Sequence, residues 1–142
     1  MACSDLAGLL CADEVGAALG AQVRPPTCLL PSPSPEGARI CLWRSASGRG
    51  WLTLTAFTGP LASHAVRLAR RGGEPVPGLG DEAWMRAGLV CVVRCDQRVL
   101  KLVLSGSRTG DPSGALVRLA HLACRRLDQP AVAPPTAPGP PP

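Results

Sequence analysis

Alternation of apolar and polar residues predicts two neighbouring strands early in the chain. Residues 51–57 (WLTLTAF) place Leu52 and Leu54 on one face and polar or aromatic residues on the other. This period of two is typical of a half-buried strand. Residues 39–45 (RICLWRS) alternate in the same way, and the short SGRG segment at 47–50 separates the two runs. We therefore expect a β-hairpin.

Three further short strands are predicted at 82–87, 89–94 and 98–104. They are separated by Gly88 and by the CDQ segment at 95–97. Separators this short favour antiparallel hairpins, because a parallel connection needs a long crossover. The LVCVV run that begins the second of these strands is apolar on both faces, and we expect it to be the central strand of the sheet.

Three segments instead have the helical period, with apolar residues at i, i+3 and i+4. Asp13 is predicted to cap a first helix that ends at Gly20. A second helix begins at Gly59-Pro60 and extends to about Arg71, since proline suits the first helical position. Asp111 is predicted to cap a last helix that extends to about residue 127.

Proline and glycine mark the segments between these elements. Five prolines within 24–37 predict a loop there, and the EPVPGLGD sequence predicts another at 74–81. Residues 1–128 are expected to form a single α+β domain, with an antiparallel sheet of about five strands and three helices packed on it. Residues 129–142 (QPAVAPPTAPGPPP) are predicted to be a disordered proline-rich tail.

The charge pattern argues against a nucleic-acid binder. The net charge is only +5, and Lys101 is the only lysine among fifteen basic residues. We interpret the excess of arginine first as codon bias. Arginines gather in the second and last helices, where they are expected to form solvated faces, and no aromatic-lined basic stripe or known motif accompanies them.

Membrane and compartment signals are sparse. No apolar run approaches the roughly 20 residues of a membrane span. The N-terminal sequence lacks the features of a signal peptide, which predicts a cytoplasmic protein as written. The alternative is an exported cell-surface lipoprotein, because Ala2-Cys3 resembles the remnant of a lipoprotein processing site.

The sequence contains seven cysteines at irregular spacings, and their expected state depends on the compartment. In a reducing compartment they would mostly be small buried hydrophobes, whereas an exported protein would contain one or two disulfides. Cys91 and Cys95 cannot pair with each other on a straight strand, because about 13 Å separates their Cα atoms. No metal site and no cofactor are predicted, since CxxC pairs are absent from the sequence.

Four segments taken in order resemble a known family. They are LLCADEVGAALG at 9–20, CLW at 41–43, PVPGLGDEAW at 75–84 and the closing amphipathic helix. In this order they resemble a family of small actinobacterial domains of unknown function, many of them lipoproteins, with a fold similar to the PsbP-like α/β/α sandwiches. The resemblance implies the fold and a binding role, and it supplies no catalytic residues. The chain departs from the family at Cys11, where relatives carry Thr.

The tryptophans are the first group of candidate ligand-binding residues. Trp43 and Trp51 are expected to share the sheet face opposite the Leu52/Leu54 stripe, and Trp84 follows the glycine loop. Three tryptophans in a chain with only 3% aromatic residues would line a ligand pocket or fill core space under the helices.

The second group of candidates is the loop of Gly78, Gly80 and Asp81. Its backbone N–H groups are suited to cradling an anion. The alternative is a tight turn that needs positive φ at one glycine, with Asp81 bonded to nearby backbone.

The function that these features favour is a non-enzymatic accessory domain that binds a small apolar ligand or a partner protein. No catalytic residue is assigned. The alternative is a small cofactor-free enzyme of a biosynthetic pathway, of the isomerase or cyclase type, in which His64 or Asp81 acts as an acid or base.

Overall fold

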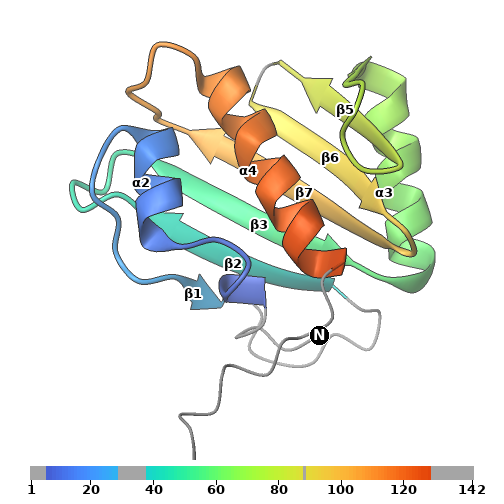
Figure 1. The fold of residues 1–142 in the computed structure, drawn as a ribbon, viewed down its shortest axis with the longest axis horizontal. Coiled ribbons are helices and arrows are strands. Elements are labelled where there is room, and N and C mark those ends of the chain that lie inside the picture. Colours follow the sequence, from blue (N-terminus) through green and yellow to red (C-terminus); the bar gives the residue numbers. More distant parts are fainter. Residues whose placement is uncertain (1–5, 29–37, 88, 129–142) are drawn as a thin grey trace, which may run out of the picture.

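The computed structural model describes residues 6–28, 38–87 and 89–128 and places them in one antiparallel sheet with helices on both faces (Figure 1). The order of the seven strands is β1-β2-β3-β7-β6-β5-β4. The strands are β1 (Thr27–Cys28), β2 (Ala38–Arg44), β3 (Trp51–Phe57), β4 (Glu74–Pro75), β5 (Glu82–Arg86), β6 (Val90–Cys95) and β7 (Arg98–Ser105). The helices are α2 (Ala12–Leu19), α3 (Gly59–Gly72) and α4 (Pro112–Asp128).

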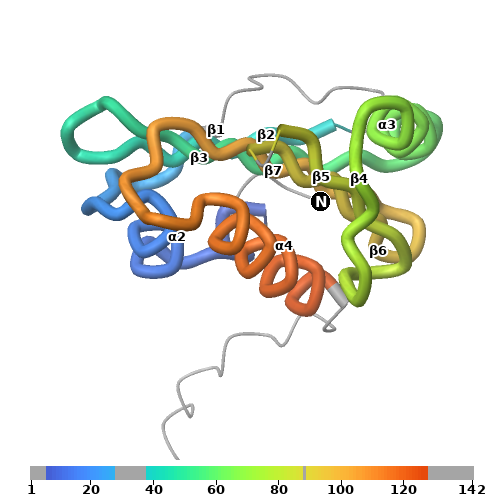
Figure 2. The backbone as a smooth tube through the Cα atoms, turned by 90° about the horizontal axis from the view of Figure 1, so that it is seen from above, coloured from blue at the N-terminus to red at the C-terminus, as the bar shows by residue number. Residues whose placement is uncertain are grey.

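The two faces of the sheet have different covers. Helices α2 and α4 lie on one face, which we call the inner face, and α3 lies alone on the opposite, outer face (Figure 2). The α+β class, the antiparallel sheet and the three helices were predicted from the sequence, and the structure confirms them. The tail, residues 129–142, lies outside the described residues.

Two strands of two residues each occur where prolines predicted loops. Strand β4 is one of them, at the edge of the sheet, with Glu74 opposite Met85. Pro75 is tolerated there because an edge strand can leave one side of its backbone unpaired. Strand β1 is the other, at the far edge of the sheet, where it pairs with β2. Residues 29–37 of the predicted loop lie outside the described residues.

The prediction that the LVCVV run forms the central strand is wrong. The middle of the sheet is β7, which pairs with β3 on one side and with β6 on the other. Strand β6 is apolar on both faces for another reason. Its Val93 is buried in the inner core under the helices, while Val92 is buried in a separate cluster with α3.

The main core fills the space between the inner face and helices α2 and α4. Its largest fully buried side chains are Trp43, Leu6, Leu19, Leu52, Leu54, Leu100, Leu102, Leu104, Leu116, Val15 and Val93. The cluster under α3 is much smaller and its buried members are Ala62, Val66, Val92 and Val99. The free energy of burial is therefore concentrated on the inner face.

Both ends of α2 can be explained by local chemistry. The helix is capped by Cys11 rather than by Asp13 as predicted, because Glu14 accepts a hydrogen bond from the Cys11 backbone N–H at 2.9 Å. Gly20 ends the helix with φ of 70°, as its position predicted. The prediction for α4 is confirmed, since Asp111 Oδ1 accepts a hydrogen bond from the Gly114 N–H at 3.0 Å.

Two cross-links tie the inner helices in place. A disulfide joins Cys95, at the end of β6, to Cys124 of α4, with Cα atoms 6.0 Å apart. The Arg126 guanidinium of α4 donates two hydrogen bonds of 2.6 Å to the Glu14 carboxylate of α2 and a third to the Leu9 carbonyl. The sequence predicted that Cys91 and Cys95 do not pair with each other, but it left the actual partner of Cys95 open.

Candidate functional site

Helix α3 covers only part of the outer face and leaves a hollow on each of its flanks. The first, the apolar cleft, has a volume of about 250 Å³ and lies between α3 and the part of the sheet formed by β5, β6 and β7. Its lining consists of Phe57, Leu61, His64, Ala65, Leu68, Ala69, Trp84, Met85, Arg86, Val90, Val92 and Lys101. Most of these side chains are apolar, and Leu68 is 48% exposed.

A hydrogen-bond network fixes the indole of Trp84 at the cleft. Its Nε1 donates to Glu82 at 3.1 Å. The same carboxylate accepts two hydrogen bonds from Arg70, of 2.6 and 3.0 Å, and lies 3.6 Å from the guanidinium of Arg94. The hydrogen bonds from Arg70 lower the pKa of Glu82. The acceptor of the indole N–H therefore stays ionised at neutral pH, which keeps Trp84 in one orientation.

The polar groups of the cleft are nitrogen-bearing side chains. His64, Arg86 and Lys101 line it, and no carboxylate does among the described residues. Within that part of the chain His64 has no hydrogen-bond partner that would orient it as a base. General acid–base catalysis needs a side chain within hydrogen-bond reach of the proton that it transfers, and in this cleft His64 is the candidate for that role.

The buried thiol of Cys91 is unsuited to nucleophilic chemistry. Burial raises its pKa to about 11, so that the thiolate is scarcely populated at neutral pH. Among the described residues no group of three or more histidine, cysteine or carboxylate side chains is placed to hold a metal ion.

The tryptophans do not lie together as expected. The register of the hairpin places Trp43 opposite Leu52 and Trp51 opposite Arg44. Directly opposed residues share a face, so Trp43 lies on the inner face, fully buried, and Trp51 on the outer face, 42% exposed. The expectation that Trp43 and Trp51 share a face is wrong. Trp43 fills the core, as the alternative interpretation predicted, and Trp84 alone of the three lines the cleft.

The glycine loop packs against the turn between β6 and β7. Asp81 accepts a hydrogen bond from the Asp96 N–H at 2.7 Å and donates its own N–H to the Arg94 carbonyl at 2.8 Å. Gly78 and Gly80 have φ of 75° and 57°, and a Cβ on Gly80 would lie 2.5 Å from the Arg94 oxygen. This is the geometry of a tight turn with Asp81 bonded to nearby backbone; binding of a ligand by this loop stays a prediction.

Several cleft residues were not singled out by the sequence reasoning. The sequence places Phe57 only within the strand at 51–57 and Leu68 only within the helix from Gly59 to about Arg71. The outward face of residues 51–57 ends in an aromatic residue. Such a residue indicates that another element packs over that end of the face, and this could have predicted the cleft. The element that packs there is α3, and its position over this face does not follow from the sequence alone.

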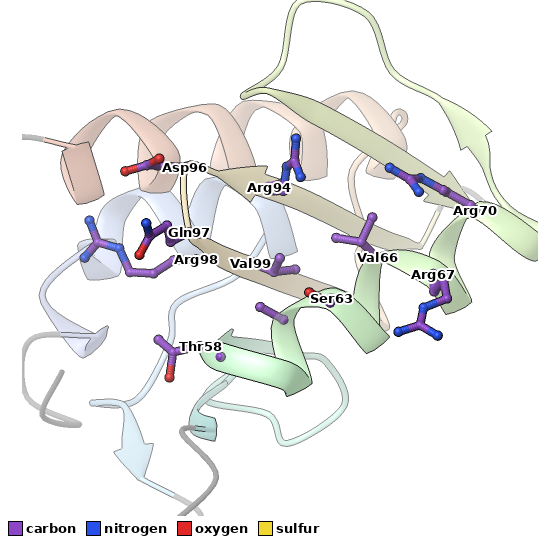
Figure 3. Close-up of a pocket in the computed structure, with 12 residues that line it drawn as sticks. Thr58, Ser63, Val66, Arg67, Arg70, Arg94, Asp96, Gln97, Arg98 and Val99 are labelled. Carbon is purple, nitrogen blue, oxygen red and sulfur yellow. The ribbon is translucent and has the colours of Figure 1, made fainter.

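The second hollow, the basic groove, lies on the other flank of α3, and its volume is about 860 Å³ (Figure 3). Arg67 and Arg70 reach it from α3, while Arg94 and Arg98 reach it from β6 and β7. None of these arginines had been predicted to form a site.

Comparisons with known proteins show a similarity of fold. No protein-family model matches the chain, and no curated protein sequence does. Among solved structures, the chain is similar to the extracellular domain of PknH from Mycobacterium tuberculosis, with a TM-score of 0.51 and 12% sequence identity. The match covers 89% of this chain and 97% of that one. At this identity the likeness describes the fold alone.

Among the described residues, none of the helices is both long and apolar enough to cross a bilayer.

Proposed function

We propose that this protein is a non-enzymatic binding domain that takes a small apolar ligand into the cleft between α3 and the outer face of the sheet. The observation that carries the proposal is the cleft itself, an apolar hollow whose one indole, Trp84, is fixed by Glu82. Small-molecule sites are typically concave, mostly apolar and provided with a few placed polar groups.

The size and rim of the cleft narrow the class of ligand. A volume of about 250 Å³ is just below the usual range for drug-sized ligands, which suits a compact molecule. Arg86 and Lys101 supply donors and positive charge, and no carboxylate lines the cleft among the described residues. The ligand is therefore an apolar molecule with one polar or negatively charged end.

We also propose that the domain acts outside the cytoplasm. The disulfide between Cys95 and Cys124 supports export, because structural disulfides are typical of oxidising compartments. The neighbour of similar fold is an extracellular domain. Membership of the actinobacterial family of lipoprotein-like domains belongs to the same proposal and is supported by the four sequence segments that resemble that family.

Fluorescence of 1-anilinonaphthalene-8-sulfonate, an apolar probe with one anionic group, tests the cleft. Leu68→Glu places a carboxylate at its exposed edge and is expected to weaken binding about tenfold, because the charge must be desolvated next to the ligand. Leu89→Glu is the matched control, since Leu89 is 41% exposed and lies outside the cleft. Equal probe affinity for both variants would contradict the proposal.

The enzyme alternative can be separated from binding with one further variant. His64 is the only candidate acid or base in the cleft that the sequence had named. In the binding proposal His64→Ala leaves the thermal shift caused by a ligand largely intact. Turnover of a bound compound that is abolished in His64→Ala would establish the enzyme instead.

A further inference from the structure

The basic groove gathers arginines from two segments of the chain, helix α3 and the hairpin of β6 and β7. Two of them lie on α3, one on β6 and one on β7, and Figure 3 shows them around a floor that includes Ser63, Val66 and Val99. Codon bias would scatter arginines over the whole surface. Here four line a single hollow on one flank of α3, beside hydroxyl and amide groups from Thr58, Ser63 and Gln97.

The charge balance of the groove is positive. Asp96 is its only carboxylate among the described residues, and it lies at the end opposite Arg67 (Figure 3). Glu82 neutralises Arg70 in part and lies 3.6 Å from Arg94. Arg98 lies opposite Cys95 and donates to the Leu127 carbonyl of α4 at 3.1 Å, so its charge is held at the α4 side of the sheet rather than in the groove. Arg67 has no ion-pair partner within the described ranges.

The geometry favours an extended anion over a single small ion. The arginines are spread around the rim rather than focused on one point (Figure 3), and about 860 Å³ is far more space than one phosphate or sulfate fills. Field lines are focused in a concave site with one sign of charge. Guanidinium groups match carboxylate and phosphate oxygens by paired hydrogen bonds.

We propose that the basic groove is a second binding site, which takes an extended ligand with several oxyanions, carboxylates or phosphates, on a hydroxyl-bearing chain such as an acidic oligosaccharide. The anionic groups contact Arg67, Arg70 and Arg94. The hydroxyl groups contact Ser63 and Gln97. This site is distinct from the apolar cleft in place and in chemistry, and neither proposal depends on the other.

Calorimetric titration at low ionic strength with three probes tests the groove. Trigalacturonate and tripolyphosphate carry several anionic groups each, one as carboxylates and the other as phosphates, and maltotriose is a neutral trisaccharide. We expect the anions to bind with millimolar or tighter affinity and maltotriose not to bind. Affinity should fall as salt is added, because the contacts are ionic and solvent-exposed.

The informative variant is Arg67→Ala/Arg94→Ala, which removes two exposed guanidinium groups and leaves the Arg70–Glu82 pair in place. The matched control is Arg118→Ala/Arg125→Ala, which removes the same charge from exposed positions on α4. The first variant is expected to weaken anion binding about tenfold, and the control to change it less than twofold. The stronger of the two anions identifies the source of the oxyanion.

Three outcomes would overturn the proposal. One is the absence of binding of either anion at about 10 mM, well above the millimolar affinity that the proposal predicts. Another is an equal loss of affinity in both variants, which would indicate a general effect of net charge. The third is tighter, Arg67-dependent binding of a single-stranded DNA 12-mer, which would make the groove a nucleic-acid site. The dye assay on the same variants monitors the apolar cleft separately.

Discussion

On the inner face of the sheet two cross-linked helices pack over a continuous core, whereas α3 lies alone on the outer face (Figure 2). A hollow lies on each flank of α3. The same sheet thus has a large buried core on one face and a small buried cluster on the other. Inner residues such as Leu102 and Trp43 are fully buried, while Trp51 and Leu68 on the outer side remain almost half exposed. In the proposals above, folding and binding therefore depend on different residues, which can be altered separately.

The largest effect should come from removing the buried indole of the inner face. Trp43→Ala is expected to lower the free energy of unfolding by about 3–5 kcal/mol, because it leaves a large cavity. Trp51→Ala, the matched change on the outer face, should cost less than about 1 kcal/mol. Urea unfolding of both variants provides the measurement. Similar losses for the two tryptophans would break the distinction between the faces.

A somewhat smaller effect is expected from the disulfide. Cys95→Ala/Cys124→Ala opens a cross-link with a sequence separation of 29 residues, for which chain entropy predicts a loss of about 3–4 kcal/mol. Unfolding of the natural protein should respond to dithiothreitol, and that of the double variant should not. Anion and dye binding should survive in the folded variant, since neither hollow is lined by these cysteines.

The ion pair between the two inner helices should have the smallest effect and a defined pH dependence. Hydrogen bonds from Arg126 lower the pKa of Glu14 from 4.5 to about 2. Because the folded-state pKa is the lower one, the contribution is complete above the unfolded value and is lost as the pH falls from about 4.5 towards 2. Partial exposure limits it to roughly 1–2 kcal/mol.

Glu14→Gln tests this contribution. The variant should be less stable than the natural protein at pH 7, and the two urea midpoints should converge as the pH falls to about 2. Midpoints that differ by the same amount at pH 7 and pH 2.5 would exclude the ion pair as the cause.

Sequence reasoning predicted the local elements well because their signals are local. The alternation in 51–57, Pro60 at the start of α3 and Asp111 before α4 each fix an element through neighbouring residues only. The face of Trp43 was wrong because it depends on the register across the hairpin, and the turn sets that register.

The sites were beyond sequence reasoning for a related reason. The pairing of Cys95 with Cys124 and the grouping of Arg67 with Arg94 join elements that only the sheet order brings together. The prediction that the α3 arginines form a solvated face was right about their exposure. It gave no account of the groove, because the second wall comes from β6 and β7.

Glu82 connects the two hollows of the outer face. Its carboxylate accepts hydrogen bonds from Trp84, which lines the apolar cleft, and from Arg70, which lines the basic groove. A ligand in one hollow that shifts Glu82 would therefore also disturb the hydrogen bond that Glu82 accepts from the other hollow. If the first ligand displaces Arg70 from Glu82, the free energy of that change alters the affinity of the protein for the second ligand. By thermodynamic linkage, the factor is the same in either order of binding.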